Sequence, residues 1–98
     1  MEINVQATNF NVDGKLVDFT KKKTKKLLQF YNRILNIDVT FKVENTSSPN
    51  NKFTELRIGV VGEIVVVKKI AKSFEEAVDQ GVRAAERMLI RHKELTRS

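Results

Sequence analysis

Apolar and polar residues alternate along four segments of the chain, and this two-residue period is typical of half-buried β-strands. The segments are residues 2–8, 35–45, about 53–61 and 64–70. In the second segment, the core-facing side is expected to consist of Leu35, Ile37, Val39, Phe41 and Val43. In the third segment, the residues expected to face the core are Leu56, Ile58 and Val60. Each strand is therefore expected to rest one face on a core.

The third and fourth strands form a predicted hairpin with its turn at Gly62-Glu63, but the length of the turn is left open. A two-residue loop would direct Val65 and Val67 to the core, whereas a three-residue loop would direct Ile64 and Val66 there. Either register leaves apolar residues on the outer face too. This pattern favours a central or partly covered strand, with a contact surface for a protein partner as the alternative.

Two further segments repeat their apolar residues with the 3.6-residue period of an α-helix. The first runs from about Lys15 to Asn32, after Asp13 as the expected N-cap. Its apolar stripe contains Leu16, Phe19, Thr20, Leu27, Phe30, Tyr31 and Ile34. Lys23 also falls on this stripe, so we expect its stem to be buried and its ammonium group to extend to solvent.

The second helix is predicted from about Phe74 to Leu95, and it opens with a capping box. Ser73 is the expected N-cap, and Glu76 stands at the third helical position. The core stripe of this helix contains Phe74, Val78, Gly81, Ala85, Met88, Leu89 and His92. Residues 45–51, which hold the only proline, are expected to form a loop.

The order β-α-β-β-β-α predicts an α+β fold, a two-layer sandwich in which both helices cover one face of a four-stranded sheet. The first crossover should be right-handed, which makes the first two strands parallel, and the other neighbours should be antiparallel. With 98 residues, we expect one domain spanning residues 1–98.

Positive charge gathers on both predicted helices of a chain whose net charge is +6. The first helix region carries Lys15, Lys21, Lys22, Lys23, Lys25, Lys26 and Arg33, and the second carries Arg83, Arg87, Arg91, Lys93 and Arg97. Like charges four residues apart repel on a helix, and the helix dipole favours cations only in the last turn. The pattern therefore predicts binding of a nucleic acid, with the basic flanks of two neighbouring helices bordering a groove for a phosphate backbone.

Catalysis, metals and cofactors are not expected. His92 is the only histidine, cysteine is absent, and no phosphate-cradling glycine loop or nucleophile motif occurs. His92 is interpreted as a structural or phosphate-contacting residue. The absence of cysteine fits a reducing cytoplasm, and neither a signal peptide nor a membrane-spanning run is present.

The aromatic residues point to shape and phosphate recognition. By periodicity, core positions hold Phe19, Phe30, Tyr31, Phe41 and Phe74, whereas Phe10 and Phe53 are left open. This favours recognition of shape and phosphate over reading of sequence. A general double-stranded RNA-binding module is the alternative function, since the predicted fold is similar in outline to such domains.

An ordered set of residues resembles the ribosome hibernation-promoting factors, also called ribosome-associated inhibitors. The first helix matches in Leu16-x-x-Phe19, Lys23-x-x-Lys26-Leu27 and Phe30-Tyr31-Asn32-Arg33-Ile34. The following strand matches in Ile37-x-Val39-x-Phe41-x-Val43-Glu44. Later matches are Gly62-Glu63-Ile64, Ala77-Val78-Asp79 and the segment from Arg87 to Lys93. The resemblance covers nearly the whole chain and is weakest in the loop at 45–52 and in the third strand.

The resemblance implies that the protein binds the small ribosomal subunit on 16S rRNA, between head and body. There it would occupy the path of messenger RNA and of the tRNAs, stop translation on 70S ribosomes and protect idle ribosomes during starvation. The chain stops at Ser98, so we expect the short type, without the domain by which long members pair two ribosomes. Whether it promotes ribosome dimers is left open.

The resemblance also implies which residues contact rRNA. The matching positions are Lys23, Lys26, Arg33, Arg87, Arg91, His92 and Lys93. Arg83, Lys22 and Lys25 lie on the same predicted surfaces and are added as candidates.

Overall fold

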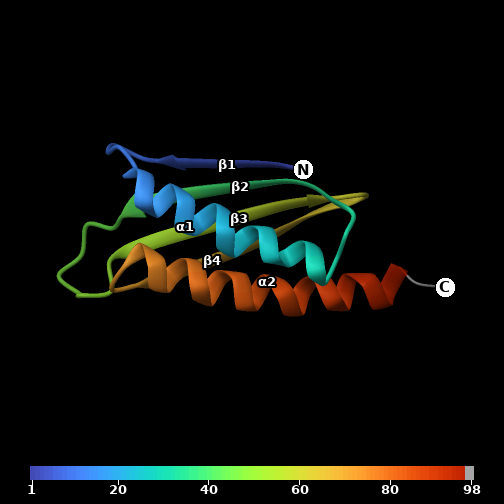
Figure 1. Cartoon of the computed structure of the whole chain (residues 1–98). Coiled ribbons are helices and arrows are strands. Elements are labelled where there is room, and N and C mark those ends of the chain that lie inside the picture. The colour runs from blue at the N-terminus through green and yellow to red at the C-terminus, as the bar shows by residue number, and fades with distance from the viewer. Residues whose placement is uncertain (97–98) are drawn as a thin grey trace.

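The computed structural model describes residues 1–96 and has the predicted two layers (Figure 1). The elements are β1 (Glu2–Ala7), α1 (Gly14–Lys25), a 3₁₀ helix η1 (Lys26–Gln29), β2 (Ile34–Val43), β3 (Lys52–Val60), β4 (Glu63–Ala71) and α2 (Phe74–Thr96). The four strands form one sheet in the order β1-β2-β3-β4, with β1 and β2 parallel and the other neighbours antiparallel. Both helices lie on the same face of this sheet, as predicted.

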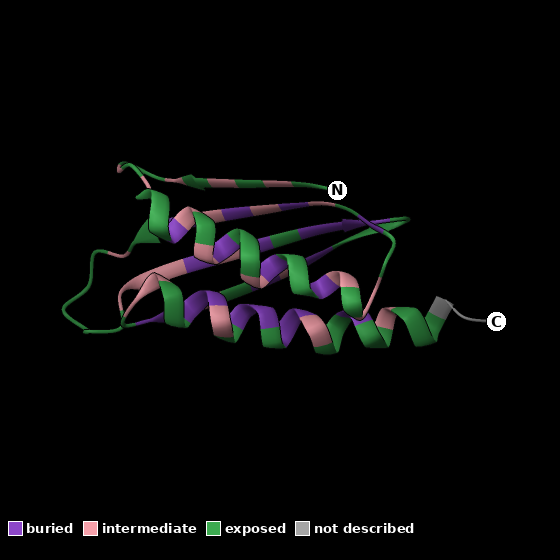
Figure 2. Cartoon of the chain, in the orientation of Figure 1, coloured by how far each residue is buried: buried purple, intermediate pink, exposed green. Residues whose placement is uncertain are grey.

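The core lies between the sheet and the helices, where Figure 2 shows the buried positions facing each other. The strands contribute Ile37, Val39, Phe41, Leu56 and Ile58, and the helices contribute Leu27, Val78, Ala85 and Leu89. Phe74, at the start of α2, packs against Phe10 and Phe41 with ring centroids 5.4 and 4.8 Å apart. The alternation of the strands and the stripes of the helices thus converge on one core.

The first helix ends earlier than predicted. Asp13 caps its start, because the backbone N–H groups of Lys15 and Leu16 donate to its carboxylate at 2.6 and 3.3 Å. After Lys25 the helix tightens into η1, and the chain then turns into β2. Ile34 therefore pairs with Val60 in the sheet and does not continue the helical stripe. Its position fits both periods, and pairing in the sheet prevails.

A β-bulge at the start of β2 reverses one predicted orientation. The register shifts between Ile34 and Asn36, so Ile34 is buried and Leu35 is 58% exposed. Val43, at the other end of the strand, is also exposed. The predicted inward orientation of Leu35 and Val43 was wrong. Alternation alone does not reveal the extra residue of a bulge, nor where the helices stop covering the strand.

The hairpin between β3 and β4 uses the shorter of the two predicted loops. Val60 pairs with Glu63, so the loop is Val61 and Gly62, one residue earlier than expected, and Gly62 has a φ of 91°. Val65 and Val67 are consequently buried beneath α2, whereas the outer face of the hairpin exposes Val61, Ile64 and Ile70.

The second helix begins at the predicted cap, where the Glu76 backbone N–H donates to the Ser73 hydroxyl at 3.1 Å. Most of its predicted stripe is buried or half-buried, but Met88 is 42% exposed. The prediction for Met88 was wrong because this residue lies at the margin of the stripe, beside the exposed Ile64 and Arg91 along the edge strand β4. No helix in the described part of the chain is long and apolar enough to span a membrane.

Candidate nucleic-acid interface

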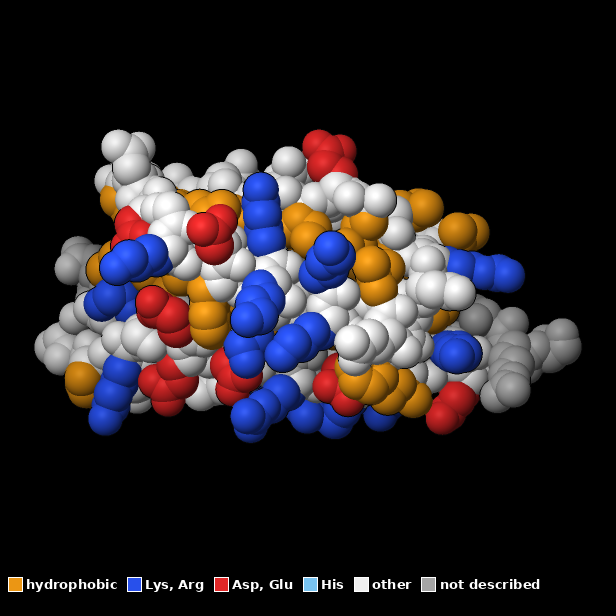
Figure 3. Space-filling view, viewed as in Figure 1, with side chains coloured by type: hydrophobic (Ala, Val, Ile, Leu, Met, Phe, Trp, Pro, Cys, Tyr) orange, Lys and Arg blue, Asp and Glu red, His pale blue; other side chains and the backbone are white. Residues whose placement is uncertain are grey.

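The first helix turns most of its lysines to solvent. Leu16, Thr20 and Thr24 form its buried side, and Thr24 satisfies its hydroxyl by donating to the Thr20 carbonyl at 2.8 Å. The exposed lysines of α1 and η1 are Lys15, Lys21, Lys22, Lys25 and Lys26. Figure 3 shows blue side chains gathered over the middle of the helical layer. These cations can approach a polyanion without displacing the core.

None of these five exposed lysines forms an ion pair with an acidic side chain in the described part of the chain. Lys22 and Lys25 also border a shallow hollow with Met1 and Ile3, at the β1 side of the layer. Positive charge that is not neutralised locally is what attracts phosphate and releases its counterions.

Asp79 connects the two helices electrostatically. Its carboxylate lies 3.7 Å from the ammonium of Lys23 on α1 and 3.1 Å from the guanidinium of Arg83, one turn later on α2. Lys23 also lies over the ring of Phe19, 5.6 Å from its centroid. As predicted, the Lys23 stem is partly covered while its ammonium reaches the margin. Such exposed pairs contribute about 0–1 kcal/mol each, so they chiefly orient the two cations.

The column of arginines does not face one groove. Arg83 meets Asp79 on the side of α1, but Arg91 lines a hollow with residues 63–66 of the hairpin, on the side of β4. Arg87 and Arg91 together border a further hollow beside Ala84 and Met88. Because a helix has 3.6 residues per turn, each four-residue step rotates the side chain by about 40°. The three arginines therefore spread across the outer surface of α2.

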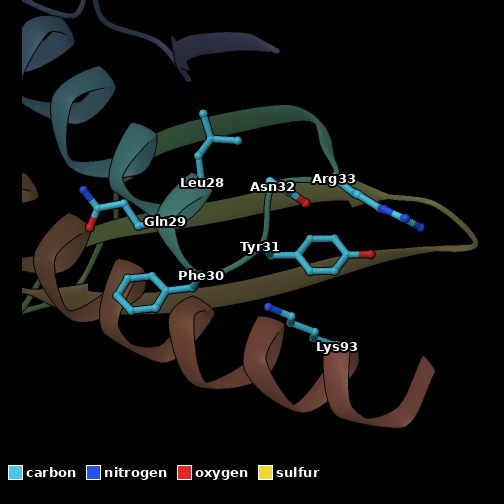
Figure 4. A pocket seen from close by; sticks show the side chains of 7 residues that line it. All are labelled: Leu28, Gln29, Phe30, Tyr31, Asn32, Arg33 and Lys93. Atoms are coloured by element: carbon cyan, nitrogen blue, oxygen red, sulfur yellow. The ribbon is translucent and has the colours of Figure 1, made fainter. Parts of the chain in front are cut away.

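A hollow with aromatic walls lies where η1 meets the end of α2 (Figure 4). We call it the end hollow. It is lined by Leu28, Gln29, Phe30, Tyr31, Asn32, Arg33 and Lys93. Arg33 follows η1 in the turn before β2, so it lies beyond α1 and not on a flank of the first helix with its lysines. The structure instead brings Arg33 and Lys93 to the same depression.

His92 is packed inside the edge of the helical layer. Its side chain is only 11% exposed, and Nδ1 pairs with the carboxylate of Glu63 at the start of β4. Its ring also meets that of Tyr31 edge to face, with centroids 5.5 Å apart. These contacts favour the structural one of the two roles expected for His92. They also tie η1, β4 and α2 together beside the end hollow.

The outer face of β1 and β2 has a different character. There Asn4 donates to Asp38 at 3.0 Å, Gln6 donates to Thr40 at 3.2 Å, and Asn36 donates to the other oxygen of Asp38. These side chains form a mostly neutral polar ladder. This face is therefore less basic around Asn4, Gln6 and Asp38 than the lysine-rich surface of α1.

Sequence reasoning missed several of these contacts. The pair of Asp79 and Arg83 could have been found from its spacing of four residues on a helix. The pair of His92 and Glu63 depends on the two-residue hairpin loop, and the end hollow depends on the early end of α1. Arg97 lies outside the described residues. Among those described, no group of three or more His, Cys, Asp or Glu side chains could hold a metal ion.

Comparison with known proteins gives the fold and the family. The chain is similar in structure to a ribosomal subunit interface protein from Coxiella burnetii, with a TM-score of 0.84 and 18% identity over 96% of this chain and 99% of that one. It is also similar to the N-terminal domain of Protein Y from Thermus thermophilus, with a TM-score of 0.80 and 19% identity over 94% and 99% of the two chains. No curated protein sequence matches significantly.

Identities below 20% establish the shared fold alone, and the family follows from the sequence. The family model described as sigma 54 modulation protein / S30EA ribosomal protein matches residues 3–97, nearly the whole chain. The predicted resemblance to hibernation-promoting factors is thereby confirmed. The chain belongs to the sigma 54 modulation protein / S30EA ribosomal protein family.

Proposed function

We propose that this protein binds the small ribosomal subunit on 16S rRNA, in the channel used by messenger RNA and tRNA. Bound there, it inhibits translation and preserves idle 70S ribosomes under starvation, in the cytoplasm. Membership of a family of ribosome-associated factors supports the ribosome as partner, and the family is not one of known enzymes.

The observation that carries this proposal is the row of unneutralised cations on the helical layer. Lys22, Lys25 and Lys26 of α1 and η1 are exposed, and so are Arg87 and Arg91 of α2. A surface of this kind fits the phosphate backbone of a folded RNA, which approaches from many directions and carries charge throughout.

The remaining candidates have graded roles in this proposal. When RNA binds, Lys23 and Arg83 each release the carboxylate of Asp79 and contact a phosphate oxygen instead. This is feasible because exposed ion pairs are weak. Arg33 and Lys93 contact rRNA from the end hollow. His92 supports them from inside the layer through its pair with Glu63.

Co-sedimentation tests the proposal. The protein should travel with 30S and 70S particles at about 50 mM salt and leave them as salt rises to about 200 mM, because phosphate contacts release counterions. The triple variant Arg83→Glu, Arg87→Glu and Arg91→Glu should keep its fold and lose ribosome binding. Absence of ribosome association at every salt concentration would refute the proposal.

A competition experiment separates ribosome binding from general binding of double-stranded RNA. A duplex-binding module recognises any A-form helix with comparable affinity. A long duplex without protein should therefore displace such a module from ribosomes at equal concentration of binding sites. Under our proposal, the duplex displaces the protein only in large excess.

A further inference from the structure

The end hollow combines groups that suit a nucleotide better than a bare phosphate. Figure 4 shows the rings of Phe30 and Tyr31 extending to opposite sides of the chain, with Lys93 reaching up from α2 between them and Arg33 lying on the side of Tyr31. Both rings are half-buried and thus keep part of their surface open to solvent. A site that needed only to attract phosphate would gain nothing from two partly exposed aromatic rings.

Contacts on the protein side fix the position of the Tyr31 ring. Its backbone N–H donates to the Leu27 carbonyl at 3.1 Å, and His92 contacts its ring at an interplanar angle of 78°. His92 is itself fixed by Glu63. The ring is therefore a supported platform, which lowers the entropy lost when a planar ligand stacks on it.

The size and the polar rim of the hollow agree with a nucleotide. Its volume is about 530 Å³, within the roughly 300–1,000 Å³ of small-molecule sites. The amides of Gln29 and Asn32 can donate to and accept from a base edge. The guanidinium of Arg33 and the ammonium of Lys93 supply charge for phosphates on either side of a base.

We propose that the end hollow binds one unpaired nucleobase of RNA, stacked on Tyr31, while Arg33 and Lys93 contact the phosphates that flank it. This inference rests on the proposed function and deepens it, because it names a single-stranded element within the folded RNA. Stacking on aromatic side chains is how proteins commonly hold unpaired bases. It adds base stacking to the expected shape and phosphate recognition, because both rings are partly exposed although Tyr31 also packs against the core.

Two RNA hairpins that differ by one base test the inference. Each is an A-form stem with one bulged nucleotide, which is an adenosine in the first and an abasic ribose in the second, so both carry the same phosphates. The protein should bind the first about 5- to 150-fold more tightly, the range expected for one base stacked on an aromatic ring. Fluorescence anisotropy at about 0.2 M salt, where the electrostatic term is weakened, measures the ratio.

Two variants assign the preference to Tyr31. Tyr31→Phe should keep it, and Tyr31→Leu, which fills similar space without a π-face, should abolish it. Arg33→Gln, at an exposed position, should weaken both hairpins about equally. Equal affinity of the unaltered protein for the two hairpins overturns the inference, and so does an undiminished preference in Tyr31→Leu.

A spectroscopic readout needs no variant. With 2-aminopurine as the bulged base, stacking on Tyr31 should quench its fluorescence when the protein binds, and unchanged fluorescence on saturation overturns the inference. Co-sedimentation with ribosomes then distinguishes the two proposals. A protein that binds ribosomes but ignores the bulged base refutes only the base site, whereas a protein that never binds ribosomes refutes the proposed function.

Discussion

Replacing Lys22 and Lys26 by glutamine should weaken ribosome binding by removing two phosphate contacts while leaving the fold intact. Both lysines are exposed on the helical layer, and neither forms an ion pair within residues 1–96. Surface substitutions of this kind change stability by less than about 0.5 kcal/mol. The thermal unfolding midpoint should therefore stay close to that of the unaltered protein.

The size of the effect follows from counterion release. Each phosphate contact adds about 0.9 to the slope of log K against log salt concentration. Losing two contacts should lower that slope by about 1.8 and, at about 0.1 M salt, reduce affinity by about 60-fold. The slope is the more specific quantity, because it counts contacts and does not depend on how strong each contact is.

A matched control comes from the opposite face of the sheet. Lys42 and Arg57 are exposed there, because they alternate with the buried Phe41, Leu56 and Ile58. Lys42→Gln with Arg57→Gln removes two cations, as the helical variant does, and takes the net charge from +6 to +4 in the same way. Any effect of net charge alone is therefore equal in the two double variants.

Titration against 30S particles at four salt concentrations between about 50 and 200 mM gives the slope for each protein. The control should keep the slope of the unaltered protein. If both double variants lose affinity to the same extent, the binding depends on net charge and the helical layer is not the interface. An unchanged slope in the helical variant would equally refute the reasoning.

Three further predictions concern the structure around the interface. Asp79→Asn should raise ribosome affinity a few-fold in the same titration, since it frees two cations and removes a repelling charge; a loss of affinity would show that Asp79 positions them for binding. Gly59→Ala should destabilise the protein by about 1–3 kcal/mol in urea unfolding, because its Cβ would lie 2.2 Å from Oδ1 of Asn36, and Asn36→Ala in the same chain should restore part of this loss. Leu89→Ala should cost about 2–5 kcal/mol, because Leu89 is 0% exposed in the core; a cost below about 1 kcal/mol would contradict that packing.

The architecture could be predicted because its main determinants are periodic. Ile37, Val39 and Phe41 alternate in one strand, and Leu56 and Ile58 alternate in its neighbour, so a single register buries all of them. Caps at Asp13 and Ser73 then mark where each helix begins. These signals are local, so neighbouring residues suffice to reveal them.

The features that escaped prediction depend on contacts between distant residues. Leu35 is exposed next to the buried Ile34 because β2 is bulged against β3, and Tyr31 is only partly buried where α1 gives way to η1. His92 is held by Glu63, about thirty positions away in the sequence. Periodicity could place the candidate cations on two helices and spread the arginines across α2, but it could not show that Arg83 meets Asp79 while Arg91 borders the hairpin.

The two proposed modes of binding should respond differently to salt, and this difference gives them separate roles. Contacts of Lys22 and Lys26 with phosphate weaken steeply as salt rises, whereas stacking of a base on Tyr31 releases few counterions. The lysines would then dominate the first approach to the ribosome, through long-range attraction. Stacking would dominate the affinity that persists at high salt and would fix the position of α1 and α2 along the RNA. A phosphate surface alone permits sliding, so one captured base at the end of the layer is what can give the complex a defined register.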